Sequence, residues 1–380
     1  MTPKLFIVVS YLGRGGTERQ MLEFVRAAHP HHADCTVLCL SDSEGEMADE
    51  VRATGARVAV LGIRRPHFVR GMVRLVRLLR RERPDAVYAL LFHQYCVALP
   101  IARVALPSAV RIGGRRHVAA FDISTIPGAR QLRLLADSVS DVVIGNSEGV
   151  RDDWLRENPR LDGRFVVVPN GLRVIESQAE PPPPGGRLRI VCTARLVDWK
   201  GHRVLVEALG RLRDRDDWQA ELIGGGPERE AIERQIADLG LGERVILHGS
   251  LPPERVHSIV AGSDLSVLPS FGEGMPNAVM EAMAHGVPCV ATDVAGVAEL
   301  LGTGAGIIVP PRDPAALAEG LARMLGDADL RTRAGAEGRR VIRERHSIER
   351  MRDATLAAVQ SAIDARSGAQ APAAAQRRAS

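Results

Sequence analysis

Short apolar runs alternate with longer amphipathic stretches along most of the chain. In the first half, the runs rich in Val, Ile and Leu lie at residues 5–10, 36–40, 57–60, 86–90, 142–145 and 165–168. The second half repeats the pattern at residues 189–193, 220–223, 245–247, 265–268, 290–291 and 305–309. Continuous apolar strands separated by helical stretches are typical of βαβ units, whose parallel sheets are buried on both faces. The pattern therefore predicts an α/β protein with two doubly wound, Rossmann-like parallel sheets.

A segment rich in proline and glycine separates the two series of strands. Residues 181–186 read PPPPGG, and such a segment cannot join a strand ladder because proline lacks the backbone N–H. We therefore predict an N-terminal domain, a linker and a C-terminal domain at residues 1–178, 179–186 and 187–346.

The chain closes with one more amphipathic pattern. Ser347 is a good N-cap residue, and the apolar spacing after it predicts a helix over residues 347–366. We expect this helix to pack back toward the N-terminal domain. Residues 367–380 have the composition of a disordered tail.

Length and composition agree with two soluble domains. The 380 residues exceed a usual single domain, and 45% apolar with 25% charged residues is a globular composition. The N-terminal apolar run passes directly into a glycine loop, and no run approaches the roughly 20 residues of a membrane-spanning helix. The five cysteines form no C-x-x-C pair. We therefore expect a cytoplasmic protein with reduced cysteines.

The net charge of +4 is unevenly distributed, because residues 64–83 hold eight arginines against one glutamate. Helical spacing places Phe68, Leu75 and Leu79 on one face, and Arg70 and Arg74 within a second stripe. Such a helix can rest on anionic lipid at the inner membrane face, or it can be a Rossmann helix with a solvated basic face. Nucleic-acid binding is not expected, since aromatic residues make up only 3% of the chain.

The most informative segment is a strand, loop and helix over residues 265–286. Its glycine loop precedes a helix that includes Pro276 and that Gly286 should end. Unpaired amides and the dipole at such a helix start favour an anion such as a diphosphate. Glu281, in the second turn of the helix, can accept hydrogen bonds from two ribose hydroxyls, whereas Glu273 on the loop would face the reacting sugar.

The E-x(7)-E spacing in FGEGMPNAVMEAMAHGVPCVAT closely resembles glycosyltransferase family 4. The resemblance implies the GT-B fold, in which two Rossmann-like domains face each other across a cleft. It also implies a nucleotide diphosphate sugar as donor, and retaining, metal-independent transfer to a glycan, lipid-linked or small-molecule acceptor. The donor-binding residues implied for this segment are Gly274, Met275, Pro276, Asn277 and Glu281.

A second segment, VCTARLVDWKG, holds Arg195 and Lys200 in a loop after a strand. It resembles the family's R-x(4)-K pair, which implies that both side chains hold the donor diphosphate. Cations are needed there because the leaving diphosphate gains negative charge as the sugar bond breaks. Gly224 and Gly225 in LIGGGPERE also resemble the family's nucleotide loop, although a tight structural turn explains a glycine run equally well.

The N-terminal half offers fewer candidates. Gly15 and Gly16 follow the first strand, and the family has a similar glycine pair that approaches the donor phosphate. The family also places a histidine or basic residue at the end of a central strand of this domain. His117 is the first candidate for that catalytic-site residue and Arg116 is the second.

No cofactor or metal is expected beyond the nucleotide sugar itself. The two D-x-D strings, which begin at Asp214 and Asp327, lie in charged helix ends or turns rather than at strand ends. A nucleotide-sugar epimerase of the same fold, or a non-catalytic nucleotide-sugar-binding protein, would keep the phosphate contacts. Both remain alternatives to the glycosyltransferase.

Overall fold

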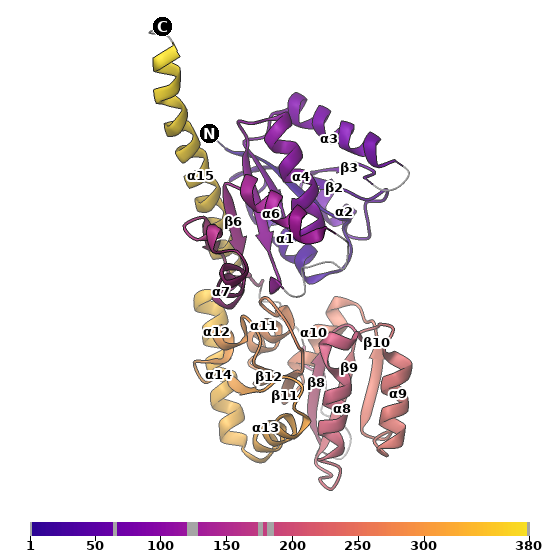
Figure 1. Ribbon diagram of the computed structural model, residues 1–380. Coiled ribbons are helices and arrows are strands. Elements are labelled where there is room, and N and C mark those ends of the chain that lie inside the picture. Colours follow the sequence, from indigo (N-terminus) through magenta and orange to yellow (C-terminus); the bar gives the residue numbers. More distant parts are fainter. Residues whose placement is uncertain (1, 64–66, 120–127, 174–177, 181–185, 378–380) are drawn as a thin grey trace. The chain divides into compact units, whose positions relative to one another are not determined.

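Two parallel sheets organise the chain, as the alternating pattern predicts. The computed structural model describes residues 2–63, 67–119, 128–173, 178–180 and 186–377. The chain builds a first unit over Met1–Gly171, forms a second over Leu172–Ser347, and completes the first with Ile348–Ser380 (Figure 1). Most of the predicted linker, residues 181–185, lies outside the described residues. Each unit is described by itself.

The first sheet has seven parallel strands in the order β3-β2-β1-β4-β5-β6-β7. Its strands are β1 (Lys4–Val9), β2 (Asp34–Cys39), β3 (Arg57–Val60), β4 (Ala86–Ala89), β5 (Val110–Arg115), β6 (Val142–Gly145) and β7 (Phe165–Val167). Six of them coincide with predicted apolar runs. The strand β5 was missed, because its sequence VRIGGR lacks a continuous apolar run although all six residues are buried.

Buried ion pairs explain how such a polar strand occupies the sheet interior. Arg111 donates to Asp141, with 2.7 Å between Nη2 and Oδ1, and Arg115 donates to the buried carboxylate of Asp137. Burying a charge is costly unless it is paired and hydrogen-bonded. These partners lie 22 or more residues away in the sequence, so local periodicity could not reveal them.

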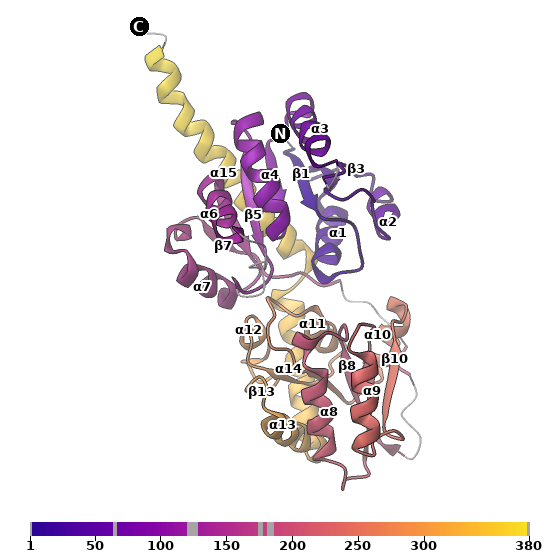
Figure 2. The same cartoon turned by 45° about the vertical axis from the view of Figure 1, so that its right-hand side comes forward.

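Helices cover both faces of the first sheet (Figure 2). They are α1 (Gly16–Ala28), α2 (Ala48–Arg52), α3 (Phe68–Glu82), α4 (Phe92–Ala105), α6 (Ala129–Val139), α7 (Glu148–Glu157) and α15 (Ile348–Arg377). One apolar cluster joins α1, α2 and α15 to the sheet through Met21, Val51 and Met351. A separate cluster joins α3 and α4 to it through Leu75 and Leu99, and also contains Ala136 of α6.

The second sheet has six parallel strands in the order β10-β9-β8-β11-β12-β13. Its strands are β8 (Leu188–Thr193), β9 (Trp218–Ile223), β10 (Val245–Gly249), β11 (Leu265–Leu268), β12 (Cys289–Thr292) and β13 (Gly306–Val309), and all six fall on predicted runs. Its helices are α8 (His202–Gly210), α9 (Arg229–Asp238), α10 (Pro253–Ala261), α11 (Asn277–Ala284), α12 (Val297–Leu301), α13 (Pro314–Gly326) and α14 (Ala328–Arg345).

The last helix, α15, belongs to the first unit. Its side chains Ile348, Met351, Val359 and Ala362 are buried in the cluster that holds β1 and α1. The helix continues to Arg377, beyond the end at residue 366 that the sequence analysis expects. Alanine is frequent after residue 366 and has the highest helix propensity, which favours this continuation.

Both sheets contain a point at which the strand order reverses, between β1 and β4 in the first and between β8 and β11 in the second. In open α/β sheets, ligands bind outside the carboxyl ends of the strands at such a switch point. The loops that follow β8 and β11 therefore lie where a ligand of the second unit is expected. These are the loops that carry Arg195, Lys200 and Glu273.

Candidate active site

The loop after β8 positions the predicted cations of the second unit. It contains the 3-10 turn Asp198–Lys200 and ends at Gly201, the N-cap of α8. Arg195 is exposed on this loop, whereas Lys200 is partly buried and lies over the indole of Trp199, with 4.2 Å from Nζ to the ring centroid. The indole face thus adds a cation–π interaction to Lys200.

Lys200 and Glu273 come together although they lie 73 residues apart in the sequence. The distance between Lys200 Nζ and Glu273 Oε1 is 2.5 Å, and the exposed fractions of the two side chains are 17% and 7%. The structure therefore joins a predicted phosphate ligand from the β8 loop to the predicted sugar-facing carboxylate from the β11 loop. Each group provides the counter-charge of the other in a largely dry environment.

Backbone contacts fix the two loops to each other. The amide of Phe271 donates to the carbonyl of Trp199 at 2.8 Å. Gly201 has φ +71°, and a Cβ there would clash with the backbone carbonyl of Pro269. Glycine is required at this position both by the left-handed conformation and by the close approach of the β11 loop.

The glycines after β9 have a structural role that does not depend on any ligand. Gly224 and Gly226 have φ +145° and +159°, and a Cβ on them would clash with the carbonyls of Ala194 and Leu196. The amide of Leu196 donates to the carbonyl of Gly225 at 2.9 Å. The β9 loop therefore supports the loop that carries Arg195. Contact of Gly224 and Gly225 with a nucleotide stays a prediction.

The helix α11 follows the glycine loop as the sequence predicts. It begins at Asn277, with Pro276 as its N-cap rather than inside its first turn, and Gly286 follows its C-cap with φ +75°. Glu281 is 7% exposed and therefore lies against protein rather than in bulk water. The first turn of any helix presents amides without intrahelical partners, so the start of α11 suits an anion. That Gly274, Met275, Pro276, Asn277 and Glu281 bind the donor stays a prediction.

His202 directly follows Gly201 as the first residue of α8, and the sequence analysis does not single it out. It is 2% exposed, and its Nε2 lies 3.8 Å from Cys192 Sγ. Burial, together with the nearby charge of Lys200, lowers the pKa of His202 to about 4. Burial also raises the pKa of the Cys192 thiol to about 12. Both side chains are consequently uncharged near neutral pH.

The remaining predicted site residues lie in the first unit. Gly15 is the N-cap of α1 and Gly16 is its first residue. His117 follows β5, and its carbonyl oxygen accepts a hydrogen bond from Trp154 Nε1 at 2.9 Å. The amide of Ala119 donates to Asp153 at 2.7 Å. Two adjacent side chains of α7 therefore hold the segment that carries His117.

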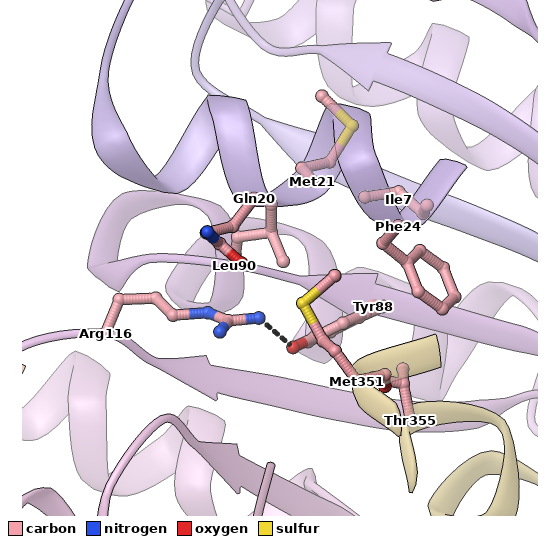
Figure 3. Close-up of a pocket in the computed structure, with 9 residues that line it drawn as sticks. All are labelled: Ile7, Gln20, Met21, Phe24, Tyr88, Leu90, Arg116, Met351 and Thr355. Atoms are coloured by element: carbon pink, nitrogen blue, oxygen red, sulfur yellow. Dashed lines mark hydrogen bonds between the residues drawn. The ribbon is translucent and has the colours of Figure 1, made fainter. Parts of the chain in front are cut away.

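Arg116, the second candidate after His117, lines a small pocket inside the first unit (Figure 3). Its Nη2 donates to the hydroxyl of Tyr88 at 2.8 Å, and its Nη1 lies 3.3 Å from Asn170 Oδ1. The other lining residues are Ile7, Gln20, Met21, Phe24, Leu90, Met351 and Thr355. The guanidinium of Arg116 is thus engaged by side chains of this pocket, and which of the two residues contacts a sugar stays a prediction.

Sequence reasoning also missed the aromatic and charged stack behind His117. The guanidinium of Arg115 lies 3.8 Å from the ring centroid of Tyr95 and 4.5 Å from that of Trp154. All three side chains are fully buried. No local pattern marks them, because the partners come from β5, α4 and α7.

Two family models match the chain in succession. The model described as Glycosyltransferase Family 4 covers residues 14–174, and the model described as Glycosyl transferases group 1 covers residues 187–327. The GDP-mannose-dependent alpha-(1-6)-phosphatidylinositol monomannoside mannosyltransferase of Mycolicibacterium smegmatis is 33% identical over 268 residues, which cover 64% of this chain and 69% of that protein. The chain belongs to glycosyltransferase family 4. The resemblance seen in the E-x(7)-E segment is thereby confirmed.

Some matches cover only a minor part of the relative's own length. The exopolysaccharide phosphotransferase SCO2592 of Streptomyces coelicolor is 34% identical over 212 residues, which cover 53% of this chain but 21% of that protein. The chain spans less than half the length of several curated relatives that it matches.

A solved structure supports the predicted fold of the family 4 protein. Anabaena Alr3699/HepE in complex with UDP superposes with a TM-score of 0.81, covering 95% of this chain and 100% of that one. At 18% sequence identity the likeness concerns the fold, which is GT-B.

Proposed function

We propose that this protein transfers a sugar from a nucleotide diphosphate sugar to an acceptor hydroxyl. The ion pair of Lys200 and Glu273 carries the proposal, because it joins a cation and a carboxylate at the carboxyl ends of β8 and β11. The name of the Mycolicibacterium smegmatis relative supports a nucleotide-sugar donor, since it specifies GDP-mannose. The UDP bound to the Anabaena protein supports it as well, because UDP is also a nucleoside diphosphate.

In this proposal the second unit holds the donor. Arg195, Lys200 and the start of α11 bind the diphosphate, Glu281 accepts hydrogen bonds from the ribose, and Glu273 orients the sugar. When the donor binds, the ammonium group of Lys200 contacts the diphosphate as well as Glu273. The roles implied for Gly15, Gly16 and His117 of the first unit stay predictions.

Transfer is proposed to retain the anomeric configuration and to need neither a metal nor another cofactor. The acceptor oxygen forms a bond to the anomeric carbon on the face that the diphosphate leaves, and the bonding electrons of the broken C–O bond pass to the diphosphate. A phosphate oxygen of that leaving group takes the acceptor proton. Arg195, Lys200 and the α11 amides stabilise the growing negative charge, which is the role that a metal ion has in other transferases.

The proposed acceptor is a glycan or a lipid-linked molecule, and the protein would work at the cytoplasmic face of the inner membrane. The phosphatidylinositol monomannoside in the name of the Mycolicibacterium smegmatis relative supports a glycolipid acceptor. The arginine-rich helix over residues 64–83 would rest on anionic lipid, although Arg64 and Arg65 lie outside the described residues. Along the described ranges, no helix is both long and apolar enough to cross a bilayer.

A thermal-shift screen against UDP-, GDP- and ADP-sugars tests the donor site. A donor present at about 100 times its Kd should stabilise the native state by about 2.7 kcal/mol through mass action. Lys200→Ala and Glu281→Ala should each reduce the shift, measured against the same variant without donor. Arg211→Ala is the control, since the guanidinium of Arg211 is exposed and pairs with the exposed carboxylate of Glu207 on α8. Unchanged shifts in both site variants would contradict the assignment.

Product analysis separates the proposed transferase from its two alternatives. A transferase yields a glycosylated acceptor with free nucleoside diphosphate, an epimerase converts the donor sugar without transfer, and a binding protein leaves the donor intact. The transferases named among the relatives favour the first outcome.

A further inference from the structure

The amphipathy of α6 is reversed relative to that of an ordinary surface helix. Arg133 and Asp137 are 0% and 1% exposed, whereas Leu132, Leu134 and Leu135 are 46%, 41% and 50% exposed. A helix on the surface of a water-soluble protein normally places its apolar side chains toward the core. The three exposed leucines therefore indicate a medium other than water on the outer side of α6.

Exposed apolar side chains of α3 accompany a row of arginines. Phe68, Val69 and Val73 are 42%, 66% and 41% exposed in the N-terminal half of this helix. The five arginines of α3 are all exposed, at positions 70, 74, 77, 80 and 81. Its one carboxylate, Glu82, is bound by Lys4, Arg57 and Arg81, so it does not offset the arginine row.

These features belong to one layer of helices. The helix α4 packs against α3 on one side and against α6 on the other, and both views show the three helices as neighbours (Figures 1 and 2). Among the described residues, seven of the ten exposed large apolar side chains lie on this layer. Arg103 of α4 and Arg130 of α6 are exposed as well. The only carboxylate on α4 and α6 is that of Asp137, which is buried.

We propose that the outer surface of α3, α4 and α6, here called the α3–α4–α6 surface, docks on an anionic phospholipid bilayer. The arginines contact the headgroups, while Phe68, Val69, Val73 and the three leucines of α6 enter the boundary of the acyl chains. This inference deepens the proposed function and rests on it, because a lipid-linked acceptor has to be reached at a membrane. It adds α6, which the basic helix over residues 64–83 did not include.

A bilayer matches this surface better than water does. An anionic membrane places phosphate groups a few ångströms from apolar chains. Arginines on one face can therefore bind phosphate while leucines on the same face contact the acyl chains. An exposed arginine beside a leucine can also extend its charged end to the headgroups while its aliphatic part stays in the apolar layer. The exposed apolar side chains of this layer are then a binding feature rather than an aggregation hazard.

Vesicle co-sedimentation tests the inference with the full chain. The probes are vesicles of phosphatidylcholine alone and of an equimolar mixture of phosphatidylcholine and phosphatidylglycerol. The α6 variant is Leu132→Gln with Leu135→Gln, and the α3 variant is Arg70→Gln with Arg77→Gln. Matched controls in the second unit are Ile246→Gln, which replaces an exposed apolar residue of β10, and Arg323→Gln with Arg333→Gln, which replaces exposed arginines.

Wild-type protein should sediment with the mixed vesicles and not with phosphatidylcholine alone. The α3 variant should bind about fivefold more weakly for each arginine removed, with a smaller salt dependence. The α6 variant should bind roughly tenfold more weakly with the salt dependence unchanged. The two control variants should bind as the wild type does.

Three outcomes would overturn the inference: no binding to mixed vesicles, equal loss in the controls, or a wild-type dimer that the α6 variant dissociates. The last would identify a second copy of the chain as the occupant. Donor turnover with water or a soluble acceptor should be the same in all variants, since none lies in the donor site. Loss of vesicle binding with donor turnover retained therefore separates failure of docking from failure of the proposed activity.

Discussion

Lys200 and Glu273 combine a predicted chemical role with a structural one. The sequence assigned one to the diphosphate and the other to the sugar, and the structure shows that they also neutralise each other. A buried ion pair contributes little net stability, but removal of one partner leaves the other charge unpaired. Loss of activity in a single variant could therefore arise from a disturbed loop as well as from a lost donor contact.

A double-mutant cycle separates these two effects. Lys200→Met and Glu273→Gln should each lower the free energy of unfolding by about 2 kcal/mol, because a buried polar group loses its partner. The double variant should be less destabilised than the sum of the single changes. Urea unfolding measures the coupling, and additive losses would show that the pair does not interact in solution. Donor binding should stay weak in the double variant, since the cation is absent.

His202 should make stability depend on pH. Its pKa is lowered to about 4 in the folded protein, against 6.5 for an ordinary histidine, so the unfolded chain binds the proton more tightly. The contribution of His202 to the free energy of unfolding is fully present above pH 6.5 and is lost as the pH drops toward 4. The expected loss between pH 7 and pH 5 is about 2 kcal/mol.

The comparison that isolates this contribution is His202→Gln against wild type, in urea unfolding at both pH values. The variant should lose less stability than the wild type between pH 7 and pH 5. An identical loss in both proteins would mean that other groups cause the pH dependence.

The loops after β8 and β11 act as one element because glycine lets their backbones meet. Gly201 and Gly240 have nearly the same positive φ, +71° and +67°. A Cβ at Gly201 would clash with Pro269, whereas a Cβ at Gly240 would meet no atom within 4 Å. The two positions thus separate the cost of the conformation from the cost of the loop contact.

Alanine at these two positions should have different effects. Gly240→Ala should cost about 1 kcal/mol, the strain of a left-handed backbone on a residue with a Cβ. Gly201→Ala should cost roughly 3 kcal/mol or more and should weaken donor binding, because the loops that join Lys200 to Glu273 have to move apart. Chemical denaturation and donor titration measure both effects. Equal costs at the two positions would refute the importance of the loop contact.

The helix α7 holds the segment of His117 through the indole N–H of Trp154. Trp154→Phe should keep most of the buried stack and lose this hydrogen bond, at a cost of about 1 kcal/mol. If His117 contacts the sugar, the transfer rate should fall while donor affinity stays unchanged.

Trp218→Phe is the matched control, because the indole of Trp218 is also buried and donates to a carbonyl, that of Leu212, at 3.0 Å. Trp218→Phe should lower the free energy of unfolding by a similar amount without slowing transfer. Equal transfer rates in the two variants, measured with saturating donor, would exclude a positioning role for Trp154.

The whole chain is built so that its last segment completes its first unit. The helix α15 contributes Ile348, Met351 and Val359 to the core around β1 and α1. Burial of such side chains contributes about 1.5–3 kcal/mol each. The first unit therefore cannot reach full stability until the second unit has been synthesised.

Truncation after Ser347 tests this dependence. The shortened chain should lose roughly 5 kcal/mol of stability in the first unit, while the second unit keeps its own core. Hydrogen exchange should show faster amide exchange in β1 and α1 and unchanged protection in β8 and β9. Uniformly faster exchange in both units would instead mean that the two units unfold together.

Most strands and the donor motifs were predictable because their signals are local. A buried parallel strand is a short apolar run, so twelve of the thirteen strands in the described residues could be identified from such runs. The glycine loop, its helix and the E-x(7)-E spacing lie within one short segment. The strand β5 has no such run, and it was missed because the partners of its arginines are distant in sequence.

By itself, the order of residues determined the class of fold, two Rossmann-like sheets, and the family of the protein, because periodicity and motif spacing depend on near neighbours. Tertiary structure alone decided which charges meet and which surfaces stay open. Three features depend on chain segments that folding brings together. They are the ion pair of Lys200 with Glu273, the hydrogen bond from Trp154 to the carbonyl of His117, and the outward leucines of α6. Such contacts depend on the packing of whole elements, and no local pattern of side chains encodes them.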